Sequence, residues 1–264
     1  MDNGKNYVLG KGKIYFDRFA SQTLVLATTT GEGERYLGNT PEFSTTSSAE
    51  NLDHFSSEGG LKLKDESVQL SLNRSGKLTC DNVSADNQAL FIQGNAGNLV
   101  QTASTGEIDL FTASKGRFYQ LGVDATNPTG VRKVSNVVIK KGAGFATVVP
   151  ALLNYEVDLE LGRIYIEANA AVIPNLTAIQ VTYDVAASTR EQIVSSTDTI
   201  YGAMRFVADN PKGTNRDYYF PYVKLSPDGD YALKGDAWQT MGFTFEVLVK
   251  AAGIATLYID GRAQ

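Results

Sequence analysis

The sequence predicts an all-β fold: an antiparallel β-sandwich or barrel with one flanking helix, into which a second, smaller β-sandwich is inserted. Two observations indicate this class. Apolar and polar residues alternate along most of the chain, which is typical of strands with one buried and one exposed face. Thirteen Tyr and twelve Phe stand against three Met, and aromatic side chains are enriched in strands. The 264 residues are enough for one large domain or two small ones, each with its own core.

The main domain is expected to begin with residues 1–111. Strand-like segments on either side of a short turn at 20–22 predict a hairpin over residues 7–28. Residues 36–60 then lack apolar periodicity, and Ser, Thr, Asn and Gly fill them. We therefore expect a long loop, and a loop of this length inside a compact domain is usually either functional or disordered.

A strand is predicted over residues 61–80, where polarity alternates. Val68, Leu70 and Leu72 are expected on its buried face because side chains two residues apart share a face. The opposite, wet face is expected to carry four uncharged polar side chains: Ser67, Gln69, Ser71 and Asn73.

One helix is predicted over about residues 85–93. Ser84 has the side chain of an N-cap, and Asp86 places a negative charge in the first turn, where the helix dipole favours it. Gly94 is placed to end the helix. Leu90 and Phe91 are expected to face the sheet. A short strand near 107–111 follows.

Residues 112–190 are expected to form the inserted domain. Three blocks with clean alternation predict its strands: 131–142, 154–166 and 176–187. Gly162 and Arg163 suit a tight turn between two of these strands. Their spacing predicts a small β-sandwich of about 75 residues.

Residues 191–264 are expected to complete the main domain with longer strands at 201–209, 216–226, 236–249 and 255–260. The sequence SPDG at 226–229 predicts a turn. In the third of these strands, apolar residues that include Met241, Phe243 and Phe245 alternate with a second set that includes Thr240, Thr244 and Glu246.

Charge and composition disfavour several classes of protein. The net charge is −5 and no block of Lys or Arg is present, so an electrostatic nucleic-acid binder is disfavoured. Cys80 is the only cysteine, so neither an internal disulfide nor a cysteine-type zinc site is expected. The chain shows no export signal and no apolar run of about 18 residues. We therefore expect a protein that is assembled in the cytoplasm and not inserted into a membrane.

We expect no catalytic, metal or cofactor site. His54 is the only histidine, so a catalytic triad or a histidine-based metal site would have to use it. Acids around Asp158 and Asp228 leave a glycosidase as the weakest alternative, because that reaction needs two carboxylates opposed across a cleft. A carbohydrate-binding or adhesion module is the stronger alternative, with a sugar platform of three aromatic side chains: Trp238, Tyr218 and Tyr219.

Two polar strand faces suit the wall of a channel. Neither the face at 67–73 nor the face formed by Thr240, Thr244 and Glu246 contains Lys or Arg. If subunits closed into a ring with these faces inward, the channel wall would not bind the phosphate backbone of DNA tightly. Such a wall favours a conduit through which DNA slides.

Four segments together resemble the major tail tube proteins of long-tailed bacteriophages. Residues 35–68, RYLGNTPEFSTTSSAENLDHFSSEGGLKLKDESV, are similar to that family's signature loop and following strand. Residues 134–166, with VSNVVIK and NYEVDLELGRIYI, are similar to the small β domain of many members. Residues 202–248, GAMRFVADNPKGTNRDYYFPYVKLSPDGDYALKGDAWQTMGFTFEVL, are similar to the second half of the tube domain, and 255–262, ATLYIDGR, to its usual ending.

The resemblance implies two packed antiparallel sheets with a flanking helix. It implies rings, usually of six subunits, or of three where two tube domains are fused, stacked into a tube that conducts viral DNA at infection. The inserted domain would project outward. The long loop would reach a neighbouring copy of the chain through six residues: Tyr36, Pro41, Phe43, Leu52, His54 and Phe55. Further implied partners in the virion tail are the tail terminator, the tape measure and the baseplate or distal tail proteins. No cofactor and no enzymatic activity are implied.

Overall fold

The computed structural model describes residues 6–19 and 31–262. It is mostly β, with 54% of residues in strands and 4% in helices, which confirms the predicted fold class. The chain divides into two compact units. The main unit comprises Met1–Ala96 and Ile193–Gln264, and the inserted unit comprises Gly97–Gln192.

The inserted unit begins earlier than the expected boundary at residue 112. The reason is β6 (Ser104–Ala113), which pairs along its length with β12 (Thr177–Val185) of the inserted unit. The chain enters this unit through β5 (Asn95–Gln101) and leaves it through β13 (Ser188–Val194), and these two strands pair as a two-stranded sheet.

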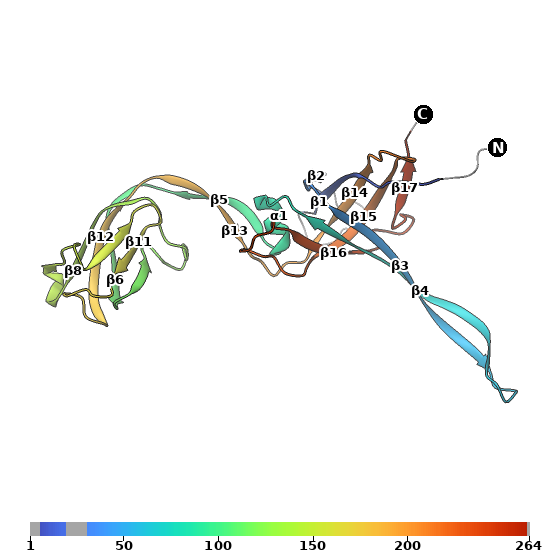
Figure 1. Cartoon of the computed structure of the whole chain (residues 1–264), viewed down its shortest axis with the longest axis horizontal. Coiled ribbons are helices and arrows are strands. Elements are labelled where there is room, and N and C mark those ends of the chain that lie inside the picture. Colours follow the sequence, from blue (N-terminus) through green and yellow to red (C-terminus); the bar gives the residue numbers. More distant parts are fainter. Residues whose placement is uncertain (1–5, 20–30, 263–264) are drawn as a thin grey trace. The chain divides into compact units, whose positions relative to one another are not determined.

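The main unit contains an eight-stranded sheet in the order β2-β1-β14-β15-β16-β4-β3, with β17 paired to β15 (Figure 1). All of the pairings within it are antiparallel. Its strands are β1 (Gly12–Arg18), β2 (Arg35–Tyr36), β3 (Glu42–Ser56), β4 (Leu63–Cys80), β14 (Ile200–Ala208), β15 (Arg216–Asp228), β16 (Met241–Val247) and β17 (Tyr258–Gly261). The strands predicted over 61–80 and over the last third of the chain are therefore confirmed.

This sheet curls over one core. Phe43 on β3 stacks on Phe206 of β14, with ring centroids 5.5 Å apart, although β15, β16 and β4 lie between the two strands in the sheet. Phe43 also stacks on Phe245 at 5.7 Å. In the described part of the main unit, one curled sheet rather than two separate sheets surrounds the core, and the helix near residue 90 packs against it. Its fully buried members include Ile14, Phe16, Leu78, Met204, Phe220, Val223, Leu225, Met241, Phe243 and Phe245.

Two expected turns have different outcomes. β15 runs through the expected turn at 226–229 as far as Asp228, because Ser226 and Pro227 pair with Thr244 and Phe243 of β16. That turn prediction is wrong. The turn expected at 20–22 and the strand after it lie outside the described residues.

The predicted helix is confirmed as α1 (Ala85–Phe91). The side chain of Ser84 accepts a hydrogen bond from the backbone N–H of Asn87, as an N-cap does. At the other end the N–H of Gln93 bonds the carbonyl of Leu90, and that of Gly94 bonds the carbonyl of Ala89. This is a Schellman ending, in which Gln93 (φ 52°) rather than Gly94 takes the left-handed conformation.

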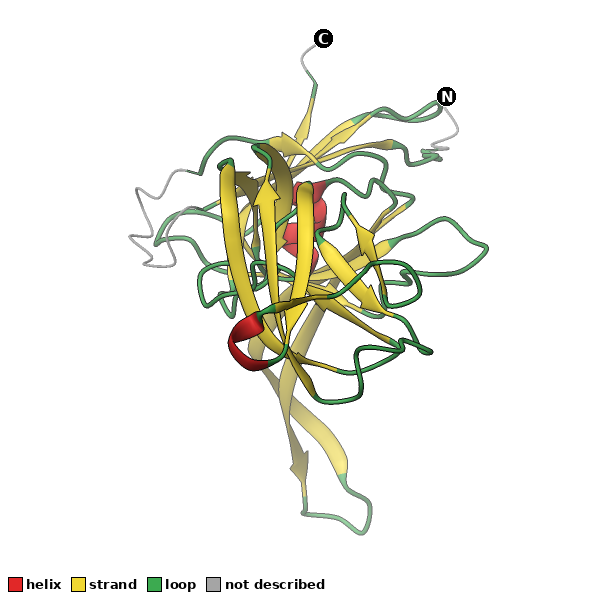
Figure 2. Ribbon diagram, turned by 90° about the vertical axis from the view of Figure 1, so that its left-hand side faces the viewer, coloured by secondary structure: helices red, strands yellow, loops and turns green. Residues whose placement is uncertain are grey.

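The inserted unit is a small sandwich of two sheets, whose strands are drawn in yellow like all strands in Figure 2. One sheet has the order β6-β12-β8-β9 and the other β10-β11-β7. Their inner faces pack around a second core that includes Leu121, Ile139, Ile164, Ile166, Ile173, Ile179 and Val181. The remaining elements are β7 (Arg117–Gln120), β8 (Val134–Lys141), the 3-10 helix η1 (Ala143–Phe145), β9 (Thr147–Val148), β10 (Tyr155–Asp158) and β11 (Arg163–Ile166).

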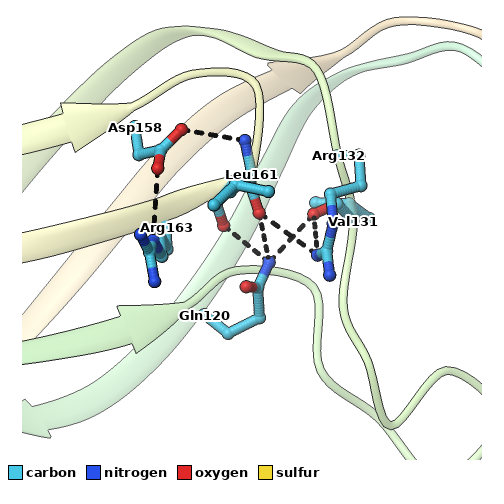
Figure 3. A network of polar contacts seen from close by, with 7 residues as sticks. Gln120, Val131, Arg132, Asp158, Leu161 and Arg163 are labelled. Carbon is cyan, nitrogen blue, oxygen red and sulfur yellow. Dashed lines mark hydrogen bonds and ion pairs between the residues drawn. The ribbon is translucent and has the colours of Figure 1, made fainter. Parts of the chain in front are cut away.

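One glutamine fixes two loops of the inserted unit (Figure 3). The Nε2 group of Gln120 lies 2.9 Å from the carbonyl of Val131, 3.0 Å from that of Leu161 and 2.8 Å from that of Gly162. Arg132 adds a guanidinium hydrogen bond to the carbonyl of Leu161. The predicted turn is present only in part. It lies at 159–162 and divides the block expected as one strand over 154–166 into β10 and β11, so Arg163 already belongs to a strand. Gly162 has φ 64°, a backbone conformation that suits glycine.

Candidate functional site

The stretch expected as a long loop is one arm of a β-hairpin. β3 and β4 pair from Glu42 and Thr79 at the base to Ser56 and Leu63 at the tip. The prediction of a loop over 36–60 is therefore wrong for most of its length. Ser and Thr side chains are compatible with strands, and apolar periodicity is weak because much of this hairpin has no buried face.

The outer part of the hairpin pairs only with itself. β16 pairs with β4 from Cys80 to Arg74, and beyond that point β3 and β4 have no other partner strand among the described residues. We call residues 48–73 the distal hairpin. Nearly all of its side chains are exposed on both faces, and its two strands run on beyond the rest of the sheet in Figure 1.

The distal hairpin carries a set of exposed large apolar side chains. Such surfaces on a protein mark sites of interaction when they are contiguous. Leu61 at the tip is 74% exposed and Phe55 beside it is 49% exposed. The other members are Leu52, Leu63, Val68, Leu70 and Leu72.

Two register shifts change which residues share a face. Glu50 pairs with Ser71, but its neighbour Asn51 pairs with Gln69, so Leu70 is an extra residue in β4. Because adjacent residues of β3 point to opposite faces, so do Ser71 and Gln69. A second shift makes Asp65 an extra residue.

The polar face predicted for residues 67–73 is therefore split. Ser67 and Gln69 lie on one side of the hairpin, and Ser71 and Asn73 lie on the other. The predicted apolar face is split as well, because Val68 pairs with Leu52 and Leu72 pairs with Ala49. A β-bulge inverts the alternation beyond it, and no residue type in this stretch marks the bulge.

The single histidine lies beside a carboxylate on the distal hairpin, near a separate Lys–Asp ion pair. His54 Nδ1 lies 2.6 Å from Asp65 Oδ1, and Lys64 Nζ lies 2.6 Å from Asp53 Oδ1. Ser67 donates a hydrogen bond to Asp53 rather than to His54. Hydrogen bonds from Lys64 and Ser67 lower the pKa of Asp53. In a catalytic triad the histidine stands between the serine and the acid, and these side chains are not arranged in that way.

The six residues expected to contact a neighbour lie in three different places. Leu52, His54 and Phe55 are exposed on the distal hairpin. Tyr36 lies on β2 against the ring of Tyr15, at 5.5 Å, and Pro41 is exposed just before β3. Phe43 belongs to the core of the main unit, so its assignment to an exposed arm is wrong.

The second candidate channel face contains lysines. Thr244 and Glu246 lie on the face of β16 opposite the buried Phe243 and Phe245, whereas Thr240 precedes the strand. Thr244 pairs with Lys77 of β4, and Glu246 pairs with Lys224 of β15.

Lys77 and Lys224 each have a carboxylate partner. Lys77 Nζ is 2.8 Å from Asp228 Oδ2, and Lys224 Nζ is 3.6 Å from Glu246 Oε2. β16 itself carries no Lys or Arg, as expected, but its two neighbouring strands place a lysine each on the same face. The ion pairs leave it close to electrically neutral.

The residues of the alternative sites are not brought together in the way those sites need. Trp238 is 95% exposed, but Tyr218 and Tyr219 are adjacent on β15 and point to opposite faces. Tyr218 packs edge-on against Phe206, and Tyr219 lies under the guanidinium of Arg205. The expected three-ring platform is therefore not formed.

The candidate carboxylates are held in local contacts. Asp158 accepts a hydrogen bond from the N–H of Leu161 and one from Arg163 Nε (Figure 3). These contacts, the one from Leu161 first, lower the pKa of Asp158. Asp228 pairs with Lys77. Asp158 thus stabilises a turn, and Asp228 stabilises a pair of side chains across the sheet.

Two further findings concern the described residues. No three His, Cys, Asp or Glu side chains among residues 6–19 and 31–262 are grouped so that they could hold a metal ion. The helices in this part of the chain are too short to cross a membrane.

Comparison with known proteins adds a family. Residues 7–254 match the model of a family described as "Protein of unknown function UCP028589". No curated protein matches the chain. The match covers most of the 264 residues. The chain therefore belongs to the protein family of unknown function UCP028589.

Proposed function

We propose that this protein is the structural subunit of a bacteriophage tail tube, in which rings, usually of six subunits, stack around a channel that conducts DNA. The observation that carries the proposal is the distal hairpin. It exposes apolar side chains on both faces, with Leu52 and Phe55 on β3 and Leu63 and Val68 on β4. Exposed apolar side chains on both faces of a hairpin are costly to leave in water and are suited to burial against another molecule.

The surface of the curled sheet is consistent with the same role. On the face opposite the core, Lys77 and Lys224 are each paired with a carboxylate. Nonspecific DNA binding depends on unpaired cations that displace counterions from phosphates. A wall of this kind therefore supports sliding of DNA rather than retention. The tail terminator, tape measure and baseplate or distal tail proteins are the proposed partners at the two ends and inside the tube, in the virion tail.

Shortening the hairpin tests the proposal. Ser47 and Arg74 are cross-strand partners, so residues 48–73 can be replaced by Asn-Gly, which favours a two-residue hairpin turn. The pairing of β4 with β16 begins at Arg74 and is left intact. We expect the full-length chain to form rings or tubes in negative-stain micrographs, and the shortened chain to remain folded and monomeric. Tubes formed by the shortened chain would contradict the proposed role of the hairpin.

Trp238 supports a second candidate function, a carbohydrate-binding or adhesion module. An indole that is 95% exposed on the loop before β16 has the chemistry to stack on a sugar ring or to anchor a protein partner. Glycan binding that disappears in Trp238→Ala would support this function. Absence of binding across a glycan array would count against it.

A further inference from the structure

A groove opens beside the base of the hairpin that β3 and β4 form. Its volume is about 420 Å³, and it lies between residues 10–12 at the start of β1 and residues 39–45, which include the start of β3. Its apolar lining comes from Phe43, Phe206 and Tyr218, which are all half-buried. Aromatic rings that remain partly open to solvent can receive further apolar side chains.

The charged residues that line this groove and the adjoining one are basic. Lys11 lines it, and Arg216 lines an adjoining groove of about 410 Å³ that shares Gly10, Phe206 and Tyr218 with the first. The described lining residues of both grooves include no acidic side chain. Neither Lys11 nor Arg216 takes part in an ion pair with another described residue.

The tip of the distal hairpin has the complementary character. Phe55, Leu61 and Leu63 are exposed there. Glu58 lies in the connection between the strands and forms none of the ion pairs found in the described part of the chain. From residue 50 to 66 five carboxylates stand against two lysines. Opposite charges around an apolar contact favour association and fix its register.

The groove on the same molecule cannot receive this tip. The groove includes Thr45 near the base of β3, whereas the strand ends at Ser56. At about 3.3 Å per residue, these two positions are roughly 36 Å apart along a paired strand. Because the strand is held extended by its ladder to β4, the tip can occupy only the groove of another copy.

We propose that the hairpin tip of one subunit, centred on Phe55, Glu58 and Leu61, docks into the groove lined by Phe43, Phe206 and Lys11 of the next subunit. This inference rests on the proposed function and names the surface that receives the hairpin. The contact joins two different surfaces of identical chains, and such a heterologous contact extends into a filament when its rotation does not close. Subunits joined in this way are spaced by roughly 36 Å, the length of β3 between groove and tip.

Cross-linking of assembled protein tests the contact. Ser57→Cys places a thiol at the tip, and Thr40→Cys places one in the groove lining. The native Cys80 is buried. With a short bismaleimide, we expect the double variant to give a ladder of linked chains on a denaturing gel. An equimolar mixture of the two single variants is expected to give linked dimers and no longer products, because each chain then offers one end of the contact.

Lys234→Cys provides a matched control, since Lys234 is exposed in the main unit and does not line the groove. Linking of Ser57→Cys to this position, or assembled tubes that give no ladder with Thr40→Cys, would overturn the inference and leave the tail tube function standing. If the unmodified chain forms no assembly at any concentration, the proposed function itself fails. The two failures are thus distinguishable.

Charge reversal gives a second measurement. Lys11→Glu alone and Glu58→Lys alone are each expected to raise the protein concentration needed for assembly severalfold. Combining the two substitutions is expected to restore part of the loss, because the pair is then attractive again. If the effects of the two substitutions on the assembly concentration simply add in the double variant, the two positions are not in contact and the inference is contradicted.

Discussion

Phe43→Ala tests the core role of a side chain that also lines the proposed docking groove. The ring of Phe43 stacks on Phe206 at 5.5 Å and on Phe245 at 5.7 Å, and it meets the edge of Phe220 at 6.4 Å. Truncation of a fully buried Phe costs about 3–5 kcal/mol. Because Phe43 is half-buried, we expect a loss of about 2–3 kcal/mol in the free energy of unfolding of the main unit.

A loss of this size corresponds to a fall of about 4–12 °C in the melting temperature of a unit of this length. Near-UV circular dichroism reports the aromatic core directly, and the two units are expected to give separate transitions. Phe55→Ala is the matched control on the distal hairpin, and its stability change is expected to stay within about 0.5 kcal/mol. An unchanged transition in Phe43→Ala, together with lost assembly, would refute the core assignment.

Three further predictions concern stability. Asn87 is buried, and its Nδ2 lies 2.7 Å from the carbonyl of Leu37 and 2.8 Å from that of Asn82. Asn87→Ala is expected to lower the free energy of unfolding in urea by about 2–3 kcal/mol. A loss below about 0.5 kcal/mol, which is typical of surface substitutions, would contradict a stabilising role for these two hydrogen bonds. Gln93→Gly is expected to raise stability by about 0.5–1 kcal/mol, since φ of 52° suits glycine; a lower melting temperature would contradict this. Hydrogen bonds from Asn136 and from the N–H of Gly106 lower the pKa of Asp184 below its usual value of 3.8. The ionised carboxylate therefore stabilises the inserted unit above that pH, and this contribution is lost as pH falls through the folded pKa. Asp184→Asn is expected to weaken the fall in the free energy of unfolding at acidic pH, and an unchanged pH dependence would contradict this role of Asp184.

The sequence predicted best where structure is set by local contacts. Helix α1 was predictable because Ser84 and Asp86 mark its start within a few residues. The alternation of Met241, Phe243 and Phe245 identified β16 because one face of this strand is buried.

The sequence singled out the segment that forms the distal hairpin, but it did not predict that this segment is a paired strand. Alternation indicates a strand only when one face is buried, and residues 48–73 have two exposed faces. The bulges at Leu70 and Asp65 have no signal in residue type, so the shared faces were assigned incorrectly. Phe43 was taken for an arm residue because its partners Phe206 and Phe245 are remote in the sequence, and the groove was missed for the same reason.

Electron cryomicroscopy of the concentrated, purified chain tests the central claim most directly. We expect tubes with an open channel, in which subunits joined through the hairpin are spaced by roughly 36 Å. In the reconstruction, the tip around Phe55 and Leu61 is expected to lie against Phe43 and Phe206 of a neighbouring copy. A monodisperse monomer at the highest attainable concentration, with the distal hairpin free in solvent, would contradict the claim.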